Sequence, residues 1–165
     1  MSRTEQLTAA KMMAQDAISG SLAECYIILS NQRINFMSAI NLEASFDKTK
    51  TDIPILGNTG KGHRSTGWEG TGKATFHYNT SIFREMMLQY KDTGQDVYFD
   101  IQITNLDPTS SIGAQTVILK NCNIDGGILA KFDADAETID EEMEFTFDDF
   151  EIPETFSLLP GMVEN

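Results

Sequence analysis

Two features typical of secreted and membrane-spanning proteins are scarce in this sequence. Only two cysteines occur among its 165 residues, Cys25 and Cys122, and both lie in strand-like segments. A disulfide between them stays open as an alternative, but buried free thiols are the favoured interpretation in a reducing compartment. No uninterrupted apolar run approaches the ~18 residues that a membrane helix needs. Because Lys11, Gln15 and Asp16 interrupt the apolar residues near the N-terminus, no signal peptide is expected, and the expected compartment is the cytoplasm.

Catalytic and metal-binding motifs are missing as well. The sequence has no C-x-x-C motif, and neither His63 nor His77 has a second group of metal ligands near it. No metal site and no cofactor is therefore expected. No Ser/His/Asp or Cys/His arrangement stands out, and a solvated acidic strand does not desolvate a carboxylate as a catalytic pair requires. The sequence favours a protein that is not an enzyme.

Basic residues are absent from the last fifth of the chain. Residues 132–165 hold 12 of the 25 acidic residues and none of the 12 Lys and Arg residues, so they carry almost all of the net charge of −13. Such a surface repels nucleic acid, because affinity for nucleic acid depends on neutralising phosphates. The segment is either a solubilising acidic tail or a non-adhesive surface that faces something anionic.

Glycine, by contrast, is concentrated in one place. Half of the 12 glycines lie within residues 57–72, and residues 67–75, GWEGTGKAT, match G-x-x-x-x-G-K. A phosphate-binding P-loop needs a Ser or Thr after the lysine and a helix immediately behind it. Here Ala74 follows Lys73 and a strand-like pattern comes next, so we reject nucleotide binding. The glycines instead predict tight turns that lead the chain out of a long loop, about 48–66, into a strand.

Short alternating segments predict strands over most of the remaining chain. Asn-Gln-Arg at 31–33 indicates a hairpin turn after the first of them. The seven strand candidates are residues 22–30, 34–50, 73–79, 96–104, 114–124, 128–135 and 141–152. The residues expected on buried strand faces include Val97, Phe99, Ile101, Ile103, Met143, Phe145 and Phe147.

One helix is expected, over about residues 80–92. Thr80 or Ser81 can cap its N-terminus by accepting hydrogen bonds from free backbone amides, and Gly94 is placed to end it. Its apolar residues form a single stripe, consisting of Ile82, Phe83, Met86, Met87 and Tyr90.

These elements predict a mainly β fold. About seven mostly antiparallel strands with closely spaced turns indicate a small β-barrel or β-sandwich with one flanking α-helix. Strands and helices do not alternate, so a doubly wound parallel sheet is not expected. We expect an N-terminal arm at 1–18, a β-domain at 19–156 and a C-terminal tail at 157–165.

Several motifs, in this order, resemble the tail tube proteins of contractile-tailed phages. The closest type is found in the PBSX phage-like element and in phage-tail-like bacteriocins. The motifs are the glycine-threonine turn Gly70–Gly72, the aromatic strand residue Phe76, Thr80 and Ser81 before a helix, Tyr90 and Gly94 at its exit, and the acidic strand Glu141–Pro153. The resemblance covers about residues 19–156, with a looser match at 19–27.

This resemblance implies a structural protein that assembles rather than catalyses. Members form a small β-barrel with a flanking helix and assemble into hexameric rings, which stack into a hollow tube. A contractile sheath drives the tube through a bacterial envelope, and in phages DNA passes transiently along the lumen. The implied partners are further copies of the chain and the sheath, baseplate and tape-measure proteins, with no membrane in the resting state. Assembly is expected in the bacterial cytoplasm, and the mature location is the phage or phage-tail-like particle.

The resemblance also implies two sets of functional residues. The family's long loop is expected to contact neighbouring subunits or rings, although its charges could also simply be solvated. The residues expected at this interface are Lys48, Lys50, Asp52, Ile55, Leu56, Lys61, His63 and Arg64. Candidate lumen-facing acids are Glu142, Glu144 and Asp148.

Two alternatives remain beside the tail tube. The first is the inner tube of a related contractile injection or secretion system, which depends on the same physics. The second is a β-barrel that binds a small ligand, which would need an apolar pocket instead of a filled core.

Overall fold

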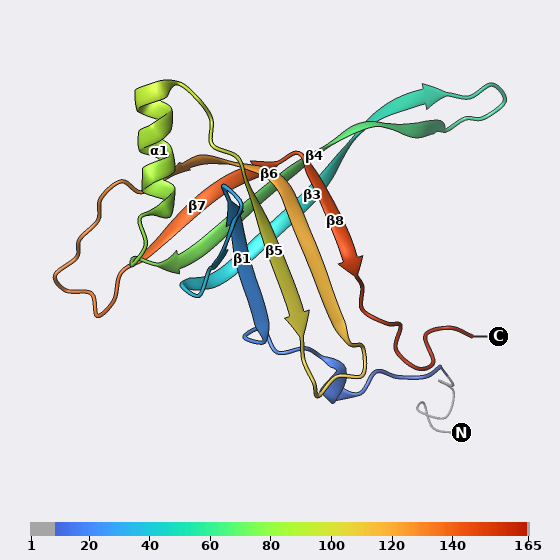
Figure 1. Ribbon diagram of the computed structural model, residues 1–165. Helices are drawn as coiled ribbons and strands as arrows, with labels where there is room; N and C mark the ends of the chain where they lie inside the picture. The colour runs from blue at the N-terminus through green and yellow to red at the C-terminus, as the bar shows by residue number, and fades with distance from the viewer. Residues whose placement is uncertain (1–8, 165) are drawn as a thin grey trace.

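Within residues 9–164, which the computed structural model describes, eight antiparallel strands and one α-helix form the regular structure (Figure 1). The strands are β1 (Ala23–Leu29), β2 (Gln32–Asn35), β3 (Ala39–Pro54), β4 (Lys61–His77), β5 (Phe99–Leu106), β6 (Ala114–Gly127), β7 (Asp140–Phe147) and β8 (Asp149–Glu154). The helix α1 spans Ile82–Thr93, and a short 3-10 helix, η2, spans Ala14–Asp16.

One sheet folds over on itself to give two layers. The strand order is β2-β1-β5-β6-β7-β4-β3, and β8 pairs with β6. β6 belongs to both layers, because its residues 116–120 pair with β8 and its residues 123–127 pair with β7. Between these stretches β6 bends at Asn121, which has a φ of 53° and lies in a bulge opposite β5.

The folded sheet is not closed into a barrel. β2 and β3 are the two ends of the strand order, and no ladder joins them within the described part of the chain. The linker between them is held by single hydrogen bonds: the Phe36 amide donates to the Cys25 carbonyl at 2.8 Å, and the His77 amide donates to the Ser38 carbonyl at 2.9 Å. The predicted mainly β, antiparallel fold with one flanking helix is confirmed as an open, two-layered sheet.

The core lies between the layers, and α1 covers one end of it (Figure 1). Alternate side chains of each strand point inward, as the two-residue period of a strand requires. The buried apolar strand residues are Ile27, Ala74, Phe76, Phe99, Ile101, Leu119, Cys122, Met143, Phe145 and Phe147. The predicted inward faces of β5 and β7 are confirmed, with Val97 and Ile103 partly buried against this core.

Helix α1 begins and ends as its sequence predicts, within two residues. The Thr80 hydroxyl accepts a hydrogen bond from the Ile82 amide at 3.4 Å. Gly94 adopts a left-handed conformation, with a φ of 74°, and its amide donates to the Tyr90 carbonyl. The buried stripe is narrower than predicted. Phe83 is buried with Met86, whereas Tyr90 is exposed, because the helix contacts only one end of the sheet.

The glycines of β4 serve a purpose that the sequence alone did not show. Gly70 lies opposite Phe147, and Gly72 opposite Phe145, in the antiparallel pair of β4 and β7. A Cβ atom at Gly72 would lie 2.3 Å from the Phe145 ring, and one at Gly70 would lie 2.4 Å from the Phe147 ring. The prediction of glycine turns here is therefore wrong: these glycines lie within a strand and make room for two aromatic rings. The same stretch is neither the loop nor the helix start that a P-loop requires.

The segment expected to be a long loop, 48–66, is mostly strand. β3 and β4 pair from Lys48 opposite Trp68 to Pro54 opposite Lys61, so that only the tip lies outside the ladder. Glycine-rich composition predicted a loop, but β-branched residues and cross-strand hydrogen bonds extend both strands. We call residues 48–66 the arm, which projects away from both layers (Figure 1).

Two shorter predictions also need correction. Residues 128–135, expected as a strand, form an irregular loop, in which the Asp133 carboxylate accepts a hydrogen bond from the Asp135 amide at 3.1 Å. Such local side-chain bonds compete with strand pairing. The first hairpin turns at Ser30 and Asn31, with φ values of 51° and 64°, rather than over 31–33.

The described part of the expected N-terminal arm lies against the loop between β5 and β6; residues 1–8 of that arm are outside the described residues. The Asp16 carboxylate accepts hydrogen bonds from the Ser111 amide at 3.1 Å and hydroxyl at 3.0 Å. These bonds, the one from the Ser111 amide above all, hold the pKa of Asp16 below its ordinary value. At the other end of the chain Gly161 packs on Ala10, so the two ends of the described chain lie together.

Adding one methyl group at Gly72 tests the close approach of β7 to β4. We expect Gly72→Ala to lower the free energy of unfolding by about 1–3 kcal/mol, because the buried Phe145 ring cannot move aside. Urea denaturation followed by circular dichroism measures the loss. Gly67→Ala is the matched control, since a Cβ at Gly67 meets nothing within 4 Å; equal stability of the two variants would contradict the role of Gly72.

Candidate functional site

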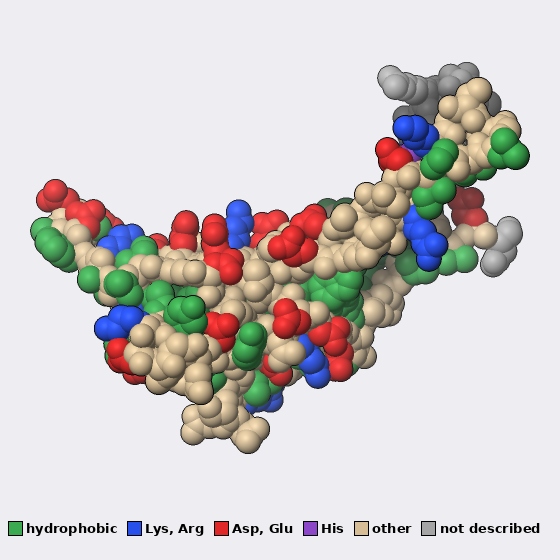
Figure 2. Space-filling model, turned by 90° about the horizontal axis from the view of Figure 1, so that it is seen from above, with side chains coloured by type: hydrophobic (Ala, Val, Ile, Leu, Met, Phe, Trp, Pro, Cys, Tyr) green, Lys and Arg blue, Asp and Glu red, His purple; other side chains and the backbone are tan. Residues whose placement is uncertain are grey.

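The outer face of the β3–β4–β7 layer is polar throughout its paired part. Three rows of cross-strand neighbours cross it: Asn41, Thr75 and Glu142; Glu43, Lys73 and Glu144; and Ser45, Thr71 and Thr146. Asp47 and Glu69 continue the face toward the arm. We call this surface the acidic face, because Lys73 is the single cation among its named residues. Figure 2 shows acidic side chains following one another along one long side of the molecule.

The structure brings two of the three candidate lumen acids together and separates the third. Glu142 and Glu144 both lie on the acidic face. Asp148 lies at the corner between β7 and β8, where its amide donates to the Lys120 carbonyl at 3.1 Å. Sequence reasoning missed Glu43, although the alternation of polar and apolar residues over 41–47 could have placed it on this face.

The acidic face is hollowed rather than flat. Shallow, open depressions on it are lined by residues that include Glu43, Lys73, Glu142 and Glu144. A site for a small apolar ligand would be enclosed and mainly apolar, whereas these depressions are open to solvent and lined by charged side chains. They do not support the alternative of a ligand-binding barrel.

The arm exposes apolar and basic side chains together. Ile53, Ile55 and Leu56 are exposed near its tip, and Leu56 is fully so. The eight residues expected at an interface all lie on the arm, and every one of them is exposed. His63 lies opposite Asp52, with its Nε2 atom 3.3 Å from the carboxylate. A two-stranded ribbon with exposed apolar residues is marginally stable by itself, so the arm has the composition of a segment that binds another surface.

An aromatic cluster anchors the root of the arm. Trp68 stacks on Phe46, with 4.9 Å between ring centroids, and meets Phe150 of β8 edge to face at 5.6 Å. Phe147 lies against the same indole at 6.1 Å. The arm therefore leaves the body from a rigid base.

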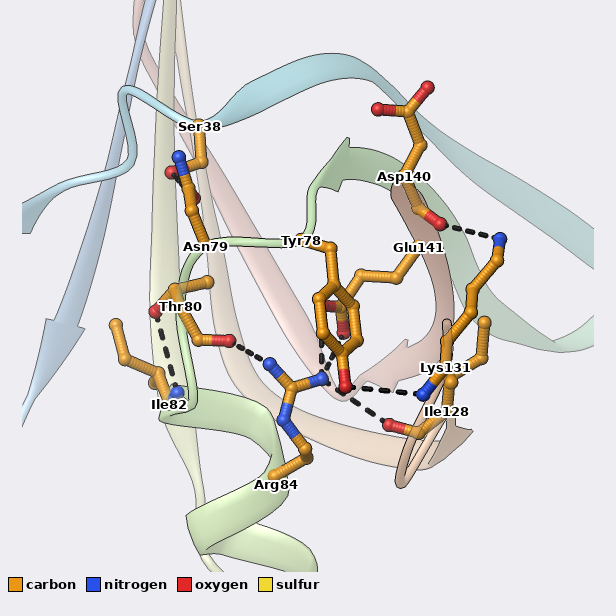
Figure 3. A network of polar contacts seen from close by, with 10 residues as sticks. All are labelled: Ser38, Tyr78, Asn79, Thr80, Ile82, Arg84, Ile128, Lys131, Asp140 and Glu141. Carbon is orange, nitrogen blue, oxygen red and sulfur yellow. Dashed lines mark hydrogen bonds and ion pairs between the residues drawn. The ribbon is translucent and has the colours of Figure 1, made fainter. Parts of the chain in front are cut away.

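An ion pair between the partly buried Arg84 and the buried Glu141 joins α1, β7 and the loop that follows β6 (Figure 3). One Arg84 nitrogen lies 3.0 Å from both carboxylate oxygens of Glu141. The same nitrogen donates to the Ile128 carbonyl at 3.4 Å, and the other terminal nitrogen donates to the Thr80 carbonyl. The guanidinium also lies over the Tyr78 ring, 4.5 Å from its centroid. Sequence reasoning did not single out this pair, although the inward alternation of β7 includes Glu141.

Redox, metal and membrane features give no sign of a different site. Both cysteines are free, as expected. Burial raises the pKa of Cys25 to about 11 and that of Cys122 to about 12. No group of three or more metal-ligating side chains occurs in the part of the chain that the structure describes. No helix among residues 9–164 is long and apolar enough to cross a membrane.

The Arg84–Glu141 pair makes a stability prediction. Arg84→Leu leaves a carboxylate buried without its partner, so we expect the free energy of unfolding to fall by about 3–5 kcal/mol. The double variant Arg84→Leu/Glu141→Leu should recover much of this loss, because it removes the unpaired charge. Urea denaturation of the two single variants and the double variant measures the coupling; additive losses would contradict a direct pair.

Comparison with known proteins identifies the family. The family model described as phage tail tube protein matches residues 10–154. The phage-like element PBSX protein XkdM of Bacillus subtilis (strain 168) is 37% identical over 146 residues, which cover 88% of this chain and 97% of that protein.

Solved structures share the fold at much lower sequence identity. A chain of the anti-feeding prophage baseplate matches with a TM-score of 0.63 and 12% identity, over 85% of this chain and 97% of that one. A chain of the sheath-tube complex of PVC, an extracellular contractile injection system, matches with a TM-score of 0.56 and 12% identity, over 94% of this chain and 99% of that one. With its two-layered sheet, its flanking helix and these relatives, the chain belongs to the phage tail tube protein family, whose members are structural proteins and not enzymes.

Proposed function

We propose that the protein is the subunit of the inner tail tube of a contractile phage tail or phage-tail-like particle such as a bacteriocin. Copies assemble into hexameric rings, and the rings stack into a hollow conduit. The observation that carries this proposal is the pair of opposite faces of one layer: an apolar face turned to the core and a polar, acidic face turned outward. A conduit needs such a face toward its lumen.

The free edges of the sheet support assembly into rings. β3 ends the strand order, so no other strand of residues 9–164 pairs with its outer edge. Exposed edges are a liability in a monomer but serve assembly when another chain pairs with them. A contact between two different surfaces of identical chains closes into rings or continues as a stack. We assign the arm, with the eight residues expected at an interface, to contacts between subunits or rings.

The acidic face is proposed to line the lumen through Glu142 and Glu144, with Glu43 beside them. Carboxylates repel phosphates, so DNA would slide through as a transient passenger. Asp148, which is exposed at the corner between β7 and β8, is the third candidate for this lining.

The matched structures favour one related function. They belong to a baseplate and to a sheath-tube complex of contractile systems. An inner tube of a related injection or secretion system is therefore the second candidate, with the same assembly. In both cases we propose sheath, baseplate and tape-measure proteins as partners, assembly in the bacterial cytoplasm and a mature location in the particle.

Assembly can be tested directly on the purified protein. Electron microscopy and sedimentation over a range of concentrations should show six-fold rings and stacked tubes. A strictly monomeric protein at every concentration would overturn the proposal. Six-fold symmetry in end-on views would separate hexamers from other rings.

Removing the outer part of the arm, Thr51–Lys61, should abolish polymerisation without unfolding the protein. We expect a variant in which Asn-Gly replaces Thr51–Lys61 to stay folded, because the aromatic root of the arm remains and the removed residues do not belong to the core. Circular dichroism and thermal unfolding check the fold, while sedimentation checks assembly. Normal tubes formed by this variant would contradict the role of the arm.

The lumen assignment makes a prediction about DNA. We expect tubes of Glu142→Lys/Glu144→Lys to retain DNA, with a salt-dependent affinity, because the reversed charges neutralise phosphates. Co-sedimentation of short duplex DNA with preformed tubes at several salt concentrations provides the measurement. The control reverses two exposed acids near the end of α1, Asp92→Lys/Asp96→Lys; equal retention by both variants would argue against a lumen position for the acidic face.

A further inference from the structure

The loop between β6 and β7, residues 128–139, exposes apolar side chains in acidic surroundings. Phe132 is 92% exposed and Leu129 is 70% exposed. Asp133, Asp135 and Glu137 follow in the same loop, and all three are exposed. We call residues 128–139 the receptor loop. Two large apolar side chains exposed within four residues of one loop are a surface feature that favours contact with another molecule.

Hydrogen bonds fix both stems of the receptor loop (Figure 3). The Ile128 carbonyl accepts from Arg84, and the Lys131 amide donates to the Tyr78 hydroxyl at 3.2 Å. The Lys131 ammonium donates to the Asp140 carbonyl at 2.8 Å. A surface that is ordered before binding loses little conformational entropy on binding, so the receptor loop is built to receive a partner.

The arm has the complementary composition. Its exposed apolar residues, Ile55 and Leu56, can pack against the apolar residues of the receptor loop. Its exposed cations, which include Lys61 and Arg64, are opposite in charge to the three acids of that loop. Complementary charge around an apolar contact gives both affinity and the correct register.

The two surfaces cannot meet within one copy. The arm forms one end of β4, and His77 at the other end of β4 pairs with Asp140, where the receptor loop ends. The 17 residues of β4 span about 50 Å at ~3.3 Å per residue. Figure 1 accordingly shows the arm and the receptor loop on opposite sides of the molecule.

Charge also decides between two possible acceptors of the arm. Exposed apolar residues gather where the two ends of the described chain meet, including Met12, Met13, Leu158 and Met162. The acids nearest to them are Asp16, which already accepts hydrogen bonds from Ser111, and Glu164, whereas the receptor loop supplies three exposed acids within five residues. The cations of the arm therefore favour the receptor loop.

We propose that the arm of one copy binds the receptor loop of the next copy, with Ile55 and Leu56 against Leu129 and Phe132. The inference rests on the self-assembly proposed above and names the contact that carries it. Because the two surfaces differ and lie at opposite ends, each copy offers one free arm and one free loop, and the contact repeats head to tail.

Cysteine cross-linking of the purified protein tests the contact with no other component present. Leu56→Cys and Phe132→Cys variants, mixed under mild oxidation at pH 8, should give a disulfide-linked dimer. The raised pKa values of Cys25 and Cys122 keep the native thiols protonated at this pH, so the wild type provides a low background. If the mixture gives no more cross-linked dimer than either variant alone, the proposed contact is wrong.

Assembly measurements provide the second test. Phe132→Ser should raise the critical concentration for polymerisation about tenfold or more, because aromatic anchors contribute most of the affinity at interfaces. Asp133→Lys/Asp135→Lys should also block assembly, and adding Lys61→Glu/Arg64→Glu in the same chain should restore it. The control is again Asp92→Lys/Asp96→Lys, which changes the charge equally away from both surfaces.

The outcomes separate this inference from the proposed function. A wild type that never polymerises overturns the proposed tube. A wild type that polymerises together with receptor-loop variants that polymerise equally well overturns only the contact, and the arm must then bind elsewhere on the neighbouring copy. Rescue by the reversed pairs, with unchanged thermal stability of every variant, supports the contact itself.

Discussion

The close contact between the phenylalanines of β7 and the glycines of β4 is the constraint on which the rest of the structure depends. Phe145 and Phe147 lie across Gly70 and Gly72, and their rings fill the space that side chains on β4 would occupy. The inner side of the β3–β4–β7 layer is therefore apolar except for Glu141, and the small glycines let it pack closely against the other layer. The outer side is then left free to be polar.

The same pairing sets the positions of both proposed assembly surfaces. β4 runs from the arm to the end of the sheet beside α1, and β7 begins where the receptor loop ends. The Arg84–Glu141 pair links that end of β7 to the helix and to the loop stem. One rigid layer thus holds the arm at one end and the receptor loop at the other. The length of β4, and not a flexible linker, therefore sets the distance between the arm and the receptor loop.

Strand patterns near the C-terminus could be predicted because the physical cause is local. The alternation of Met143, Phe145 and Phe147 with acids requires a half-buried strand whatever its neighbour is. The capping residues of α1 are equally local, and Gly94 ends the helix as expected. The mainly β class and the membership of the tail tube family follow from such signals.

Features that depend on distant partners could not be predicted in this way. The role of Gly72 depends on Phe145, which is far along the chain, and glycine composition alone indicates turns. The strands of the arm exist because β3 and β4 pair, although each reads as loop by itself. Glu43 was missed although residues 41–47 alternate, because its place on the acidic face depends on Lys73 of β4, which pairs with it from far along the chain. The burial of Glu141 could not be predicted, because it depends on Arg84, which lies 57 residues away in the sequence.

The pairing of β3 with β4 has two irregularities, and they have one more consequence. Ile40 is an extra residue in β3, whereas Thr66 is an extra residue in β4 opposite Thr49 and Lys50, so the regular ladder lies between these two positions. Each bulge changes the local twist, so a strand added to the outer edge of β3 could continue a straight ladder only between them. In the proposed assembly the two bulges would limit the length of a partner strand and would hinder the indefinite edge-to-edge growth that leads to fibrils.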